Sequence, residues 1–266
     1  MNVGILPGFP QYGIDQGVLP GLPASRASHD DVVRGIAGLR QWYAADKIPG
    51  VTHGAGVALW PDASGNGFDV VQATAGNRPV FQNDIFNGQP AVLFTAASSQ
   101  YLQNTSQDPF AAGAARTVFV ATRAAYGTGG GVTFICYRLT SRAAVYQGYF
   151  QSGGFSGIFF TDGTSVNNFN PSVNGINQTL GIYCARTAAG AIGKFRMNGG
   201  NCDVTGDAVI AEAGTTGFYI GRRELAPPTQ FMQGHIAEII AYTGELSDAD
   251  CLLVEKSLMR KYVDLS

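Results

Sequence analysis

The sequence predicts an all-β fold, a two-sheet antiparallel β-sandwich, preceded by an extended N-terminal arm and closed by a C-terminal helix. Three observations lead to this class. Short apolar or alternating runs recur along the 266 residues without helical patterns between them. The 36 glycines, with many Asn, Ser and Thr, supply turns between these runs. Hydrophobic residues make up 45% of the chain and charged residues only 14%, which supports a sizeable core.

Residues 1–28 are expected to form the arm. Two nearly identical apolar heptapeptides, GILPGFP at 4–10 and GVLPGLP at 17–23, contain prolines that prevent a helix. The same prolines, and the absence of Lys or Arg before Arg26, argue against an export signal. We expect an assembly element whose apolar side chains dock on neighbouring subunits or on a partner: Ile5, Leu6, Phe9, Tyr12, Val18, Leu19 and Leu22.

The remaining chain, 29–266, is treated as one domain. Ser28 followed by Asp31 is a helix N-cap pattern and predicts a short helical turn. Trp42 and Trp60 are assigned to the core. Strands are predicted wherever an apolar or alternating run is bounded by turn residues, at 39–44, 57–60, 91–94, 117–122, 132–137, 144–150, 158–161, 180–185, 191–197, 218–221 and 235–242.

The closing helix has the clearest boundaries in the sequence. Ser247 and Asp250 form an S-x-x-D capping pattern, and basic residues stand in the last turns, where the helix dipole favours cations. We expect this helix to pack on the sandwich through an apolar stripe of Leu252, Leu253, Leu258, Met259 and Tyr262.

Charge and cysteine content exclude several classes of function. The formal net charge is −2 and no basic stripe is present, so nucleic acid is not an expected partner. No uncharged apolar run approaches the length of a membrane helix, so membrane insertion is not expected. The cysteines form no C-x-x-C pair; we expect buried thiols, with a Cys184–Cys202 disulfide as the alternative.

Three stretches, taken in order, resemble the laminin-G-like branch of the concanavalin A-like lectin/glucanase family. Residues 57–81 are similar to its tryptophan strand, Asp-x-Ser-Gly-Asn-Gly turn and Asn-x-Pro segment. Residues 87–103 (NGQPAVLFTAASSQYLQ) and 217–262 are similar to later strands and the closing helix, and 36–50 resembles the opening strand. The resemblance covers about 36–266 and implies a jelly-roll sandwich, but it says little about function.

Glucanases of this family place two Glu and one Asp on a single strand in an E-x-D-x-E pattern, so that alternation turns the carboxyl groups to one face. This chain has no such motif. Its first glutamate is Glu212, and Glu238 stands alone in AEIIAY. We therefore expect no enzyme. His29, His53 and His235 have no evident partners in the sequence and are expected to be structural or solvent-facing.

The DASGNG segment at 62–67 begins like a calcium loop. Ala73, however, stands where an EF-hand places its bidentate Glu. We expect a tight turn of the Asx type and no cofactor. A calcium site formed by Asp62, Asn66 and Asp69 is the alternative.

Lectins of the family bind glycans with stacking aromatic residues and a few polar anchors. On this chain the candidate glycan contacts lie in the glycine-rich middle and in the loop after residue 221. We expect most of the aromatic members to belong to the core, and a glycan contact is the alternative. The candidates are Tyr146, Tyr149, Asp162, Asn168, Arg222 and Arg223.

The arm, the missing export signal and a lectin-like domain without catalytic carboxylates together favour a phage virion structural protein, such as a capsid decoration, fibre or tail-tip component. The expected location is the virion, after synthesis in the host cytoplasm. Expected partners are other virion proteins, further copies of the chain (preferentially as a trimer) and a host surface glycan. The alternative is a free-standing carbohydrate-binding lectin module of a secreted glycan-active protein.

Overall fold

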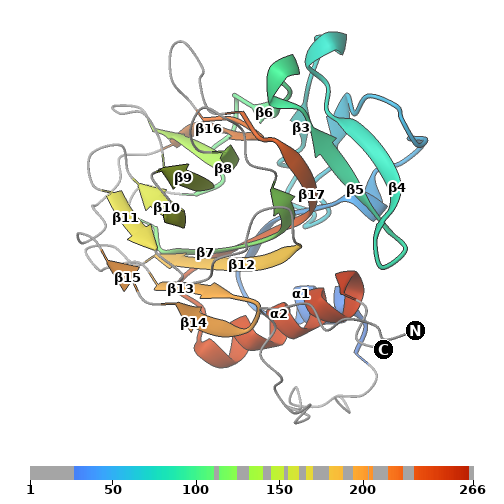
Figure 1. The fold of residues 1–266 in the computed structure, drawn as a ribbon. Helices are drawn as coiled ribbons and strands as arrows, with labels where there is room; N and C mark the ends of the chain where they lie inside the picture. The colour runs from blue at the N-terminus through green and yellow to red at the C-terminus, as the bar shows by residue number, and fades with distance from the viewer. Residues whose placement is uncertain are drawn as a thin grey trace, which may run out of the picture.

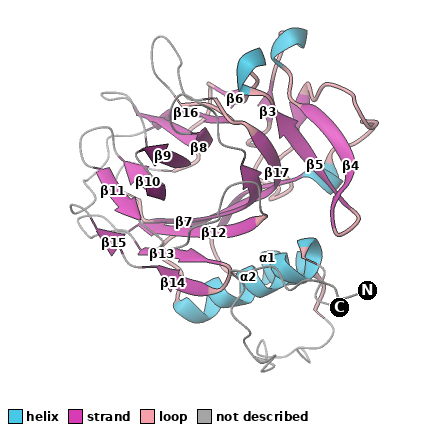
Figure 2. Cartoon of the chain, in the orientation of Figure 1, coloured by secondary structure: helices cyan, strands magenta, loops and turns pink. Residues whose placement is uncertain are grey.

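The computed structural model of the chain describes residues 27–110, 114–124, 132–139, 145–152, 155–161, 166–169, 180–187, 194–202, 204–205, 215–223 and 231–263. Within these ranges the protein is an all-β sandwich of two antiparallel sheets, as predicted, with a layer of helices on one outer face (Figures 1 and 2). Residues 1–26 of the predicted arm, including its seven apolar residues, lie outside the described residues, so the boundary between arm and domain stays a prediction.

Sheet A has eight strands, in the order β14-β13-β12-β7-β17-β5-β4, with β1 also paired to β17. The long strand β17 is central. On one side it pairs with β7, and on the other it pairs first with β5 and then with β1. The strands are β1 (Leu39–Ala44), β4 (Val80–Phe86), β5 (Gln89–Phe94), β7 (Arg116–Ala124), β12 (Gly181–Thr187), β13 (Lys194–Met197), β14 (Gly200–Cys202) and β17 (Gly234–Thr243).

Sheet B has nine strands, in the order β15-β11-β10-β9-β8-β16-β6-β3-β2, and arches over sheet A (Figure 1). Short 3-10 turns (Ala45–Lys47, Ala75–Asn77 and Ala96–Ser98) interrupt the connections. The strands are β2 (Leu59–Trp60), β3 (Val70–Val71), β6 (Leu102–Asn104), β8 (Val132–Leu139), β9 (Val145–Ser152), β10 (Phe155–Thr161), β11 (Val166–Phe169), β15 (Val204–Thr205) and β16 (Thr215–Ile220).

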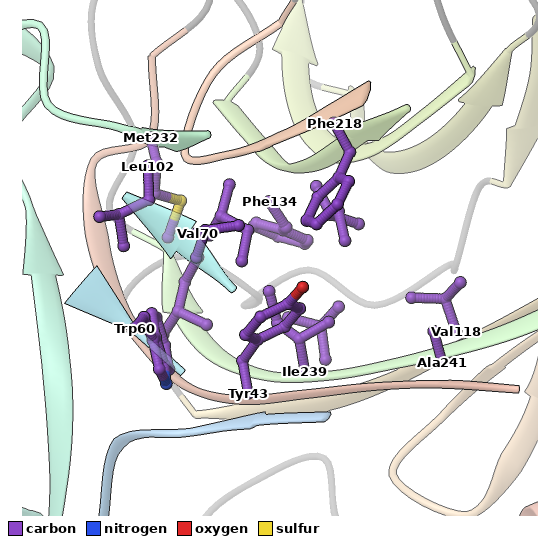
Figure 3. Close-up of a cluster of buried hydrophobic side chains, with 14 of the residues drawn as sticks. Tyr43, Trp60, Val70, Leu102, Val118, Phe134, Phe218, Met232, Ile239 and Ala241 are labelled. Carbon is purple, nitrogen blue, oxygen red and sulfur yellow. The ribbon is translucent and has the colours of Figure 1, made fainter. Parts of the chain in front are cut away.

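The main core lies between the two sheets. Alternation along each strand turns every second side chain inward, so apolar residues of both sheets meet there. Figure 3 shows Tyr43 and Ile239 of sheet A facing Phe134 and Phe218 of sheet B. Trp60 is fully buried in this cluster, which confirms its assignment to the core.

A second apolar cluster lies between the outer face of sheet A and the helices α1 (His29–Gly35) and α2 (Asp248–Tyr262). It includes the fully buried Trp42. Both predicted helix starts are confirmed. The Ser28 side chain accepts from Asp31 N in a reciprocal capping box, and the Ser247 side chain accepts from Asp250 N.

The buried face of α2 differs from the predicted stripe. Leu252, Leu253 and Met259 are only partly buried, while Glu255 and Ser257 are buried. The predicted strands are confirmed with shifts at their ends, whereas six strands were missed: β3, β4, β6, β11, β14 and β15. Neither α1 nor α2, nor any other helix among the described residues, is long and apolar enough to cross a membrane.

Candidate functional site

The outer face of sheet B, turned away from the core, carries a row of cross-strand partners. The row runs from strand to strand through Leu59, Val71, Gln103, Tyr219 and Cys136. Directly opposed residues share a face of a sheet, and the residues that alternate with them fill the inner core. Leu59 and Val71, 42% and 47% exposed, are the exposed large hydrophobic residues in the described part of the chain. Leu59 and Val71 therefore form an exposed apolar strip over β2 and β3, whereas Tyr219 and Cys136, farther along the row, are buried.

Arg222 lies against two tyrosine rings of this face. Its guanidinium carbon is 4.2 Å from the ring centroid of Tyr101 and 4.1 Å from that of Tyr219. The two tyrosine centroids are 6.3 Å apart at 63°, and Phe231 lies 6.4 Å from Tyr101. Tyr219 is buried, and the other three residues are partly exposed. We call Tyr101, Tyr219, Arg222 and Phe231 the arginine–tyrosine cluster.

Backbone geometry holds Arg222 in place. Gly221 has a φ of +88°, a left-handed conformation that glycine adopts without strain. A Cβ at this position would lie 2.5 Å from the ring of Phe94. The Gly221 N–H donates to Phe134 O, and Arg222 pairs with Phe231 in an isolated β-bridge. Gly221 thus lets the chain turn tightly over the core and delivers the guanidinium to the tyrosines.

Tyr101 is also fixed from the backbone. Its N–H donates to Asn77 O at 3.2 Å, and its carbonyl accepts from Gln72 Nε2 at 3.1 Å. Tyr101 directly precedes Leu102, which points into the core, so the alternation of the chain turns the tyrosine outward. The cluster is assembled from segments of the sequence that are more than a hundred residues apart.

The predicted glycan contacts are only partly placed by the structure. Arg222 enters the cluster, and Arg223 follows it as a partly exposed residue. Tyr146 is the register partner of Cys136, so its backbone continues the outward row onto β9. The backbones of Tyr149 and Asn168 lie on β9 and β11. Asp162 lies outside the described residues. Tyr101 and Tyr219, which complete the cluster, were not predicted as contacts.

The calcium candidates form a structural turn. Asp62 Oδ1 accepts from the N–H groups of Trp42 and Ser64, and Asp62 Oδ2 accepts from the Ser64 hydroxyl and the Phe68 N–H. Asp69 Oδ1 accepts from Asp62 N at 2.8 Å. The third candidate, Asn66, donates its side-chain amide to two carbonyls of the 39–40 segment. These contacts are those of the predicted Asx-type turn, and no group of three or more His, Cys, Asp or Glu suited to a metal occurs among the described residues.

A buried carboxylate lies on the opposite side of sheet A, under the helices. Glu238 Oε1 accepts from His29 Nε2 at 2.7 Å and from Trp42 Nε1 at 2.5 Å. Glu238 Oε2 accepts from Lys261 Nζ at 3.0 Å and from the Tyr262 hydroxyl at 2.7 Å. Burial alone would raise the pKa of this carboxyl, but the contacts with His29, Lys261 and Tyr262 lower it to about 2. We call these five residues the Glu238 cluster.

His29 also contacts Ser257, with its Nδ1 2.9 Å from the hydroxyl oxygen. No partner for this histidine was evident from the sequence, because both contacts come from residues more than 200 positions away. A Ser–His–Glu series of contacts resembles a hydrolase triad only superficially. The Ser257 hydroxyl donates to Val254 O within α2, and Ser257 and Glu238 are 2% and 1% exposed. A nucleophile in this position cannot reach a substrate, so the contacts tie α1 and α2 to sheet A.

Three of the four cysteines are described as buried thiols. Cys136, Cys184 and Cys251 take part in no disulfide, and the sulfur atoms of Cys184 and Cys251 lie 3.8 Å apart. The alternative Cys184–Cys202 disulfide is therefore not formed. Burial raises the pKa of the Cys184 thiol well above its usual value, which makes it a poor nucleophile.

Comparison with known proteins shows similarity of fold. No family model and no curated protein matches the sequence. Domain 4 of the GH43 extracellular arabinanase of Geobacillus stearothermophilus, solved with arabinotriose, superposes with a TM-score of 0.56 at 12% identity. The match covers 83% of this chain and 98% of that domain.

Two further solved structures are similar. The ligand-binding domain of botulinum neurotoxin serotype D, solved with N-acetylneuraminic acid, has a TM-score of 0.57 at 11% identity over 87% of this chain and 53% of its own. Trypanosoma rangeli sialidase, solved with 2,3-difluorosialic acid, has a TM-score of 0.54 at 14% identity over 98% of this chain and 36% of its own. The chain thus spans about half of the toxin domain and a third of the sialidase, and at these identities the likeness shows the β-sandwich fold.

Proposed function

We propose that this protein is a carbohydrate-binding β-sandwich domain and that the arginine–tyrosine cluster is part of its glycan contact. The observation that carries the proposal is the stack of the partly exposed Arg222 on Tyr101 and Tyr219 at the outer face of sheet B. Sugars are bound by aromatic rings that contact their C–H faces and by a few polar groups that orient their hydroxyls. The partly exposed Tyr101 and Phe231 offer the rings, and Arg222 offers N–H donors.

The apolar strip beside the cluster favours an extended ligand. Gln103 connects Tyr219 to Val71 and Leu59 in one cross-strand row. Strands in a sheet lie about 4.8 Å apart, so four strands give a contact length of roughly 15 Å. That length suits a chain of three sugar units better than a single sugar. The similar domain that was solved with arabinotriose supports this interpretation.

The proposed function is binding without catalysis. Hydrolysis of a glycosidic bond by paired carboxyl groups needs two of them at the sugar. One must have a raised pKa so that it is protonated and acts as the acid, and the other must be ionised. The one glutamate inside a predicted central strand, Glu238, is buried with four donors and has a lowered pKa. Such a carboxyl is ionised and inaccessible, which suits a structural role.

The setting we propose for this domain is a phage virion, where it would be displayed as a decoration, fibre or tail-tip component and contact a host surface glycan. This finer proposal is supported by the sequence of the arm, 1–28, with its two Pro-stiffened apolar repeats. We propose that the arm joins the chain to other virion proteins or to further copies in a homo-oligomer, preferentially a trimer. A free-standing lectin module is the other candidate.

A glycan array tests the binding proposal. The wild-type domain should bind a subset of oligosaccharides, and Tyr101→Ala and Arg222→Ala should each weaken that binding about tenfold. Arg260→Ala is the matched control, since Arg260 is an exposed arginine on α2, far from sheet B. Binding that Arg260→Ala reduces as much as Arg222→Ala would refute the cluster as the contact. If the folded wild-type domain binds no oligosaccharide on the array, the proposed carbohydrate-binding function is refuted.

Deletion of 1–26 tests the setting and keeps Ser28, which caps α1. An assembly arm predicts that the truncated protein loses incorporation into particles or changes its oligomeric state, measured by light scattering, while its glycan binding is retained. A free-standing lectin predicts an unchanged oligomeric state. Changing Phe9 and Leu22 together to Asp should reproduce the deletion if the apolar side chains dock.

A further inference from the structure

A second polar cluster lies on the outer face of sheet A, beside the helix layer. Cross-strand register places Val80, Leu93, His235 and Arg123 in one row over β4, β5, β17 and β7. All four side chains are partly exposed. The residues that alternate with them, such as Val92 and Ile236, belong to the main core. The row is therefore a solvent-facing surface, and the proposed function does not account for it.

The contacts of His235 fix its protonation and orientation. Arg123 Nη2 lies 3.3 Å from His235 Nδ1, and His235 Nε2 lies 2.8 Å from Gln82 Oε1. A guanidinium can only donate, so Nδ1 must accept, and the single imidazole proton resides on Nε2 and is donated to Gln82. The amide nitrogen of Gln82 then points away from the histidine. Phe86 packs edge-on against the imidazole, with ring centroids 6.1 Å apart.

Electrostatics leaves this cluster with one positive charge at neutral pH. Burial, and the charge of Arg123, lower the pKa of His235 to about 4, so the imidazole is neutral. The other neighbours of the histidine, Gln82 and Phe86 on β4 and Leu93 on β5, carry no titratable group. The guanidinium also lies 5.1 Å over the Phe86 ring, and no ion pair recorded among the described residues uses it.

We propose that Arg123, with the amide of Gln82 and the imidazole of His235, is a second binding site, for a carboxylate carried by an acidic sugar. A guanidinium presents parallel N–H donors that match the two oxygens of a carboxylate. The Phe86 ring beneath it fixes the plane of that fork. The Gln82 amide nitrogen, which points away from His235, is placed to donate to a sugar hydroxyl, while the imidazole orients Arg123 and Gln82 through its two nitrogens. This site is on the opposite sheet from the arginine–tyrosine cluster, so its test is independent of the test of the proposed function.

Binding at this site has a signature that a merely structural cluster would lack. A bound carboxylate pairs with Arg123 and offsets the charge that depresses the pKa of His235, so the histidine should titrate at higher pH. By linkage, the ligand must bind more tightly where His235 is protonated. A rise of one pKa unit corresponds to tenfold tighter binding at low pH.

The experiment is NMR titration of the full chain with glucuronate, and with acetate, sulfate and glucose as separate probes. Glucuronate should raise the pKa of His235 by about half a unit to one unit. Acetate should do so more weakly, and glucose should have no effect. Arg123→Gln should abolish the glucuronate response, whereas Arg260→Gln, a matched surface control, should keep it.

Other results overturn the proposal. A His235 titration that glucuronate does not move would show that no carboxylate binds beside Arg123. An equal response to sulfate and glucuronate would overturn the carboxylate assignment and leave a general anion contact. If Arg123→Gln proves unstable, the wild-type response to glucuronate and glucose still decides the question, because it needs no variant.

Discussion

Replacing Glu238 by Gln removes a buried charge without changing the shape of the side chain. In the folded protein the carboxylate accepts four hydrogen bonds. One comes from the cationic Lys261, and the others come from His29, Trp42 and Tyr262. The glutamine of this variant would keep one oxygen as acceptor but would turn an amide toward donors that need an acceptor. The variant therefore loses charge pairing and gains a donor–donor conflict, and both effects destabilise the fold.

The magnitude follows from the pKa of the carboxyl. A fall from 4.5 to about 2 in the folded state corresponds to roughly 3 kcal/mol of stability at pH 7. Because the folded-state pKa is depressed, this contribution is complete above the unfolded-state value near 4.5. It is lost as the pH falls toward 2, where the folded-state carboxyl also takes up a proton. The gap in unfolding free energy between wild type and Glu238→Gln should therefore be widest above pH 5 and should narrow steadily below it.

Urea denaturation followed by tryptophan fluorescence at pH 7, 5, 4 and 3 measures this gap, since Trp42 lies in the Glu238 cluster. Glu245→Gln is the matched control. Glu245 pairs at the surface with Lys194, whose side chain is 61% exposed, so its loss should cost less than about 1 kcal/mol. A Glu238→Gln variant as stable as wild type, or a gap that does not change between pH 7 and pH 3, would refute this account of the carboxylate.

Two further predictions concern the turns that shape the sandwich. Gly221→Ala should lower the unfolding free energy by about 2 kcal/mol or more and weaken glycan binding, because residue 221 is in a left-handed conformation and its new methyl group would collide with the Phe94 ring. A variant as stable as wild type in thermal unfolding would contradict this. Asp62→Ala should lower the unfolding free energy by about 2–4 kcal/mol, because it removes the acceptor of four hydrogen bonds. Millimolar calcium or a chelator should leave the melting temperature of wild type unchanged, and a melting temperature that depends on calcium would show that Asp62 is a metal ligand.

Local signals in the sequence predicted the elements that local physics determines. The serine caps at Ser28 and Ser247 begin α1 and α2 as expected, because a side-chain acceptor near free N–H groups needs no distant partner. Strand β1 has the predicted bounds, since its aromatic and aliphatic residues are buried on both faces. Strands β3 and β6 were missed because runs of two or three residues carry no periodicity.

Strand β4 was missed for a different reason. Its middle is polar and exposed, and Asp84 adopts a φ of +54°, so the register to β5 shifts between Gln82 and Phe86. A bulged, polar edge strand resembles a loop in sequence. Pairing with β5 through the 87–88 turn, rather than intrinsic preference, makes it a strand.

The candidate sites depended on contacts between distant segments, which no single pattern in the sequence reveals. Arg222 was identified from its loop, but its tyrosine partners required the register between β6 and β16. His29 and Glu238 are 209 residues apart. One signal was present: a single glutamate within an apolar strand must be buried with partners, because an unpaired buried carboxylate is too costly. That signal predicts a partnered Glu238 but not which residues provide the donors.

The central claim, that the arginine–tyrosine cluster binds glycan, is tested most directly by isothermal titration of wild type and Arg222→Ala with the best oligosaccharide from the array. We predict about tenfold weaker binding for the variant, with the melting temperature unchanged because Arg222 is partly exposed. Equal affinities of the two folded proteins for the same oligosaccharide would contradict the claim.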